Sequence, residues 1–162
     1  MYIKAVLKTN YFNFDIMKTI ERRSTCPINY SVEIFGDKWM LLLLRDLMFN
    51  GKNSFLEFRA SDEKISSAVL TEKLNTLLNE GIVSKITSPK NASKFLYLLT
   101  DKGIELVPFM VEFLNWGSRY NPDGGPQLLL EGIKKNKKKA ITELQDKLRN
   151  QRHSHSENNA IK

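Results

Sequence analysis

Residues 65–79 read ISSAVLTEKLNTLLN, and this stretch decides the fold. Its leucines recur at the spacing i, i+4, i+7 and i+8, which places them in one stripe along a helix. Ser66 is a residue type that caps the start of a helix, and Gly81 ends the periodic pattern. The opposite face carries Ala68, Glu72 and Asn75. We therefore predict a helix with one buried side and one small, polar side that is open to a partner. The leucines of the buried stripe are Leu70, Leu74, Leu77 and Leu78.

Three further helices are predicted before this one. Pro27 suits the first turn of a helix that runs to Phe35. The next helix, from Lys38 to about Phe49, is apolar nearly all round, so we expect it at the buried centre of the domain. Ser54 then caps a short helix that ends near Ser61.

The segments that follow predict a β-hairpin and a closing helix. Residues 82–86 and 95–99 have the composition and alternation of strands, and residues 88–93 form the turn between them. Thr100 caps a helix that runs toward Gly117. Three helices, a hairpin with a basic turn and a closing helix are the elements of a winged helix-turn-helix. We predict an α+β, mostly helical fold, with a two-stranded wing and a C-terminal helical extension.

The chain is expected to divide into one domain with an appended tail. Its 162 residues suit a single domain. We expect a leader at residues 1–21, the winged helix-turn-helix domain at 22–120, a linker at 121–126 and a basic helical extension with a disordered end at 127–162. A lysine-rich run at 134–139 has two interpretations, a solvated helix face or added attraction for phosphates.

Charge and residue usage narrow the function classes. The net charge is +7, but residues 126–162 hold nine Lys and Arg against four Asp and Glu, so the rest of the chain is nearly neutral. A single cysteine excludes an intrachain disulfide and suits a reducing cytoplasm. No apolar run reaches the roughly 18 residues that a membrane helix needs. The only histidines are His153 and His155, so we expect no catalytic residue, metal or cofactor.

The predicted elements suit duplex DNA as the partner. A helix fits the major groove, and a wing reaches the backbone beside it. Short side chains at the start of the 65–79 helix let its positive end approach phosphates closely. Glu72, on the exposed side, is able to accept a hydrogen bond from a cytosine amino group. The expected DNA-contacting residues are Arg59, Lys64, Ser66, Ser67, Ala68, Thr71, Glu72, Lys73, Lys90, Asn91 and Lys94.

Several short motifs extend across residues 22–120. They include Cys26-Pro27, Gly36-Asp37-Lys38-Trp39, Phe55-Leu56-Glu57-Phe58, Ile65-Ser66, Leu70-Thr71-Glu72-Lys73-Leu74, Glu80-Gly81-Ile82-Val83, Tyr97-Leu98-Leu99-Thr100 and Trp116-Gly117. With these motifs the chain resembles the HxlR family of MarR-like bacterial regulators. The resemblance implies a dimeric, DNA-binding regulator of transcription with a pseudo-palindromic operator. It implies that residues 65–78 are the recognition helix, that 87–94 form the wing, and that the first and last helices of the domain make the dimer.

Within that implied dimer we expect Phe109, Phe113 and Trp116 at the contact, because they repeat at helical spacing on one face. Some family members sense oxidants or electrophiles through a cysteine at the Cys-Pro position, so Cys26 is a possible sensor or, alternatively, a small buried residue at the contact. Two other functions stay open: a winged-helix interaction module without a specific operator, and, less well supported, a thiol enzyme. The sequence does not name an inducer.

Overall fold

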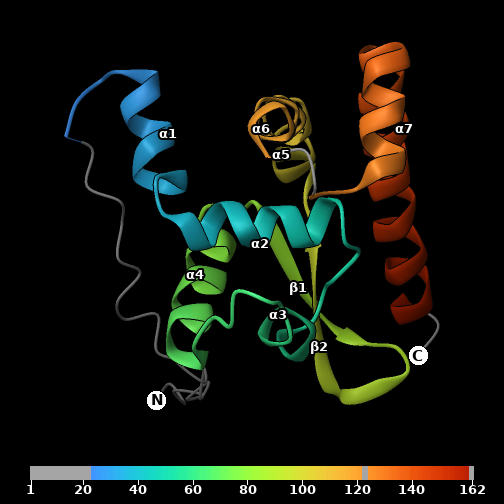
Figure 1. Cartoon of the computed structure of the whole chain (residues 1–162). Coiled ribbons are helices and arrows are strands. Elements are labelled where there is room, and N and C mark those ends of the chain that lie inside the picture. Colours follow the sequence, from blue (N-terminus) through green and yellow to red (C-terminus); the bar gives the residue numbers. More distant parts are fainter. Residues whose placement is uncertain (1–22, 122–123, 161–162) are drawn as a thin grey trace, which may run out of the picture.

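The computed structural model describes residues 23–121 and 124–160. Within them the chain folds in the order predicted for a winged helix-turn-helix, so the fold class is confirmed. The leader assigned to residues 1–21 and positions 122 and 123 of the linker lie outside the described residues. Figure 1 shows α2 crossing the middle of the molecule, with α4 and the β1–β2 wing reaching the same side below it.

The helix at the centre is α2 (Lys38–Met48), which follows α1 (Pro27–Phe35). Met40, Leu43, Leu44 and Leu47 on α2 are buried in one core. Its start is capped by Asp37, whose carboxylate accepts from the Trp39 N–H at 2.7 Å. The burial agrees with the nearly continuous apolar sequence of this helix.

The two helices of the helix-turn-helix are α3 (Phe55–Arg59) and α4 (Ser67–Asn79). Phe58 anchors α3 in the core, and Leu70, Leu74 and Leu77 anchor α4. The Ser66 hydroxyl accepts from the Val69 N–H at 3.3 Å, which confirms the predicted cap. The predicted stripe is therefore the buried side of α4, and Leu78 at its margin is only partly buried.

The wing is the antiparallel pair β1 (Val83–Ser88) and β2 (Asn91–Leu99), with Val83 opposite Leu99 and Thr87 opposite Phe95. The strands extend further outward than predicted, and the turn shrinks to Pro89 and Lys90. The two strands stay paired beyond the residues whose apolar and polar side chains alternate, as far as Ser88 and Asn91. A register shift between Thr87 and Ser88 accommodates the turn.

The closing helix predicted from Thr100 is two helices, α5 (Asp101–Ile104) and α6 (Val107–Tyr120). The break falls at residues 105 and 106 because Pro108 has no N–H to donate to the carbonyl of Ile104. It fits instead in the first turn of α6, which continues past Gly117 to Tyr120.

The C-terminal extension is α7 (Gln127–Ala160), and it bends back on itself at Asn136. A Cβ built on Gly132 would lie 3.7 Å from that of Ala140, whereas eight residues of a continuous helix rise about 12 Å. Residues 127–135 and 137–160 therefore form a helical hairpin. The side-chain Oδ1 of Asn136 accepts from the Lys139 N–H at 3.0 Å and caps the start of the second helix. The tip of this hairpin is the exposed lysine run at 134–139.

The extension packs on the domain rather than hanging free. Leu130, Ile133, Leu144 and Leu148 are buried, and Arg152 pairs with Asp101 of α5 at 2.9 Å. Helix α7 runs to Ala160, and the disordered end expected for the last dozen residues stays a prediction.

Candidate nucleic-acid interface

The exposed side of α4 begins with short side chains. Ser66, Ser67, Ala68, Thr71 and Glu72 are all exposed. The first turns of α4 therefore present hydroxyls, a methyl group and one carboxylate to the outside. Side chains of this length allow a helix to enter a groove and place its end against a polyanion.

Three cationic residues lie on α4 or close to its start in the sequence, and they differ in the groups they contact. Lys64 is exposed and has a positive φ of 55°. Arg59 of α3 donates a hydrogen bond to the hydroxyl of Ser67. Lys73 pairs with Asp37 and Glu72, both at 3.2 Å. Burial lowers the pKa of Lys73, but the hydrogen bonds to Glu72 and Asp37 outweigh it and leave the pKa above its ordinary value.

The wing places Lys90 and Asn91 at its exposed tip. Lys94 lies nearer the base, where its ammonium group pairs with Glu57 at 3.1 Å. Glu57 also accepts from the N–H groups of Asn53 and Ser54 at 2.9 and 3.1 Å. Burial raises the pKa of Glu57, but these hydrogen bonds bring it below its ordinary value. Glu57 therefore ties the wing to the start of α3.

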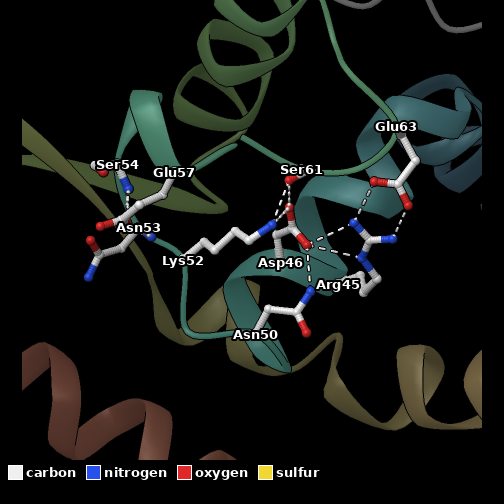
Figure 2. Close-up of polar contacts among 9 residues, drawn as sticks. All are labelled: Arg45, Asp46, Asn50, Lys52, Asn53, Ser54, Glu57, Ser61 and Glu63. Atoms are coloured by element: carbon white, nitrogen blue, oxygen red, sulfur yellow. Dashed lines mark hydrogen bonds and ion pairs between the residues drawn. The ribbon is translucent and has the colours of Figure 1, made fainter. Parts of the chain in front are cut away.

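A polar cluster fixes the segment that leads into α4 (Figure 2). Asp46 of α2 is only 2% exposed. Its carboxylate accepts hydrogen bonds from Ser61, from Asn50 at 2.7 Å, and from Lys52 at 3.3 Å. Burial raises the pKa of Asp46, but the hydrogen bonds, led by that from Ser61, hold it below its ordinary value. The buried carboxylate is therefore charged and satisfied.

Arg45 links this cluster to Glu63, a second residue of the segment that leads into α4. Its guanidinium group donates to Asp46 at 2.8 Å and to the second carboxylate oxygen of Glu63 at 3.0 Å. The hydrogen bond from Arg45 lowers the pKa of Glu63 to about 2. Sequence reasoning missed this cluster. The signal was present, because Arg45 and Asp46 interrupt an otherwise apolar helix, and charges inside a buried helix need partners.

Comparison with known proteins agrees with this geometry. The HxlR-like helix-turn-helix family matches residues 34–124, more than half of the chain. The chain belongs to this family. The HxlR-like domain thus includes the buried α2 centre, α3, α4, the wing and α6.

Relatives of the HxlR-like chain share its regulatory description. The HTH-type transcriptional regulators YdeP and YvaP of Bacillus subtilis are 34% and 33% identical over 59% of this chain, which covers 73% and 88% of their lengths. The solved structure of the redox regulator HypR in its oxidized form is 32% identical, with a TM-score of 0.52 over 58% of this chain and 96% of that one. HxlR-like proteins are DNA-binding regulators of transcription and not enzymes.

The HxlR-like domain carries an uncovered apolar face. Phe109, Phe113 and Trp116 on α6 are 47%, 50% and 61% exposed. The rings of Phe109 and Phe113 stack with centroids 6.1 Å apart. Ile28 and Val32 of α1 are also exposed, and a hollow lined by both helices, including Val32 and Phe109, joins the two sets. The structure thus leaves the predicted contact residues uncovered in the single chain.

Cys26 is the residue just before α1, and it is exposed. Its alternative interpretation, a small residue buried at the dimer contact, stays a prediction. The part of the chain that the structure describes contains no cluster of three or more metal-ligating side chains. Among the described helices, none has the length and apolar character needed to cross a membrane.

Proposed function

We propose that this HxlR-like regulator binds a pseudo-palindromic operator as a homodimer, with α4 of each subunit in the major groove of one half-site. The observation that carries the proposal is the exposed start of α4, where Ser67, Thr71 and Glu72 stand free of the core. Hydroxyl and carboxylate groups of this kind read base edges. A dimer would place two such helices about one DNA turn, roughly 34 Å, apart.

The phosphate contacts are assigned to the cations that surround α4 and the wing tip. Lys64 and Lys90 are exposed and stand beside the two elements that would reach the duplex. Lys94 and Lys73 already pair with Glu57, Asp37 and Glu72. Since a paired lysine loses part of its attraction for phosphate, we expect Lys64 and Lys90 to contribute more to binding than Lys94 or Lys73.

The test separates base reading from phosphate attraction. Binding of the full chain to a selected operator and to random duplex DNA is measured over a range of salt concentrations. Ser67→Ala and Glu72→Gln are expected to change which operator sequences are preferred. Lys90→Ala is expected to weaken binding to all sequences alike and to lower the salt slope by about one. A uniform loss for Ser67→Ala and Glu72→Gln would remove α4 as the reading helix.

The alternative function, an interaction module without a specific operator, makes a different prediction. A protein contact made by apolar groups depends weakly on salt, whereas phosphate neutralisation gives a steep fall in affinity. If operator and random DNA bind equally and weakly while a protein partner binds independently of salt, the interaction module replaces the proposal.

The second part of the proposal concerns regulation, with the Cys26 thiol as a sensor of oxidants or electrophiles. Its exposure beside Ile28 and Val32 would place the thiol at the border of the proposed dimer face. HypR, whose oxidized and reduced forms are both solved, is a redox regulator of similar fold. With one cysteine in the chain, oxidation would form a Cys26–Cys26 bond between subunits, or an electrophile would form an adduct.

Diamide treatment followed by gel shift tests the thiol. Wild type is expected to lose operator binding, with a crosslinked dimer on non-reducing gels, and Cys26→Ser is expected to be unaffected. Equal binding by both proteins before and after treatment would make Cys26 structural and leave operator binding itself untouched.

A further inference from the structure

A cavity of about 440 Å³ lies between α2, α6 and the residues just before α7, Gly125 and Pro126. Its apolar wall is made by Leu41 and Leu42 of α2 and by Met110 and Leu114 of α6. Phe49 and Phe113 add two aromatic rings. A volume of this size lies within the range of roughly 300–1,000 Å³ that holds small organic ligands.

The polar side of the cavity is formed by the segment that precedes α4. Asp62 and Glu63 of that segment and Arg45 of α2 line it. Asp62 stands between two anchored neighbours, because Ser61 is hydrogen-bonded to Asp46 and Glu63 is paired with Arg45. The Asp62 carboxylate is exposed and has no ion pair among the described residues.

The charges at this wall favour a cation over an anion. Arg45 already pairs with Glu63 and Asp46. Lys52 pairs with Asp46 and donates a hydrogen bond to Ser61. An anion would have to displace an internal carboxylate to reach either cation. Among these charged residues, Asp62 is the carboxylate without an ion pair, so the cluster together with Asp62 keeps one net negative charge. The same cavity is lined by the rings of Phe49 and Phe113. A cation bound in it is attracted both by a carboxylate and by aromatic rings.

We propose that this cavity binds a small lipophilic cation and that its occupancy alters the position of α4. The Asp62 carboxylate that would hold the cation belongs to the segment from Ser61 to Ser66, and this segment leads directly into the cap of α4. Phe113 belongs both to this wall and to the proposed dimer face. The effect on DNA rests on the proposed operator binding, whereas binding of the cation does not.

Tetraphenylphosphonium is the probe, and tetraphenylborate is its control of the same shape with opposite charge. Calorimetric titration of the full chain is expected to give phosphonium binding at least tenfold tighter than borate binding. Asp62→Asn is expected to weaken phosphonium binding about fivefold or more, because it removes the charge and keeps the shape. Glu131→Gln, on an exposed carboxylate of α7 outside the cavity, is the matched control and is expected to bind as wild type does.

A second measurement separates this proposal from operator binding. Phosphonium is expected to change the operator affinity of wild type at least fivefold and that of Asp62→Asn much less. Equal binding of phosphonium and borate, or unchanged binding by Asp62→Asn, would overturn the cation site. Phosphonium binding with unchanged operator affinity would overturn the coupling to α4. A chain that binds the cation as expected but no operator would overturn only the proposed DNA function.

Discussion

Asp46 shows how one buried side chain sets the position of an exposed helix. It lies on α2, yet its hydrogen bonds from Ser61 and Asn50 reach both the segment before α4 and the end of its own helix. A buried carboxylate is tolerated only when its oxygens are fully occupied. The exposed side of α4 is therefore positioned by a residue that does not belong to it.

Asp46→Asn is expected to lower the free energy of unfolding by about 2–4 kcal/mol, because the amide leaves charged and hydroxyl donors in a buried site without a full acceptor. Urea unfolding followed by circular dichroism measures the change. Asp62→Asn, in the same segment but exposed, is expected to stay within about 0.5 kcal/mol of wild type. Equal stability of the two variants would mean that the cluster contributes nothing.

The segment between α3 and α4 depends on acid-sensitive pairing. The pKa of Glu63 lies at about 2 instead of the usual 4.5. A carboxyl group whose pKa is lowered by folding stabilises the fold above its unfolded pKa and loses that contribution as pH falls through the folded value. The window for Glu63 therefore runs from about pH 4.5 down to about 2.

Glu63→Gln is expected to flatten the loss of stability within this window. The Glu63 side chain is 34% exposed, so solvent screening reduces the contribution to about 1 kcal/mol at neutral pH. Urea midpoints measured at pH values from 2 to 7 check the slope. Parallel profiles for wild type and variant would contradict the role of the Arg45–Glu63 pair.

The helical hairpin of α7 adds to the same core as the domain. Leu144 and Leu148 are buried, and the side chain of Gln145 donates to the Ile104 carbonyl at 3.3 Å. Leu144→Ala is expected to cost about 2–3 kcal/mol. Tryptophan emission from Trp39 and Trp116 should report one cooperative urea transition that shifts with the variant. Lys147→Ala, on the exposed side, is the control, and an unshifted transition for Leu144→Ala would make the extension an independent unit.

At the scale of the whole molecule, α1 and α6 leave an apolar face that a single chain does not cover. Phe109, Phe113 and Trp116 would be costly to leave in water together, and homodimers commonly bury such a patch against its own copy. The same pairing would set the spacing of the two α4 helices.

Phe109→Asp is expected to give a monomer in sedimentation at micromolar concentration and to reduce operator affinity, because a charge in the contact loses its hydration without gaining a partner. Leu128→Asp is the control, since Leu128 is an exposed apolar residue of α7 and does not belong to the two helices of this face. A Phe109→Asp protein that remains a dimer, or a wild type that is already a monomer, would contradict the assignment of this contact.

Local sequence determined the helices, the caps and the buried stripe of α4. The leucine spacing, the Ser66 cap and the glycines at 51 and 81, both with a φ of +66°, depend only on residues within a few positions of each other. The same local rules explain the break before α6, since the missing N–H of Pro108 was visible in the sequence.

The tertiary structure alone decided which polar groups meet. Asp46 and Ser61 are 15 residues apart and Lys94 and Glu57 are 37 apart, and no periodic pattern joins them. Several other features depend on how distant segments pack. They are the ion pairs of Lys73 with Asp37 and of Lys94 with Glu57, the reversal of α7 at Asn136, and the cavity beside Asp62. Periodicity fixes which side of an element is apolar, whereas the partner of a charged group is set by the three-dimensional arrangement that burial of the apolar sides produces.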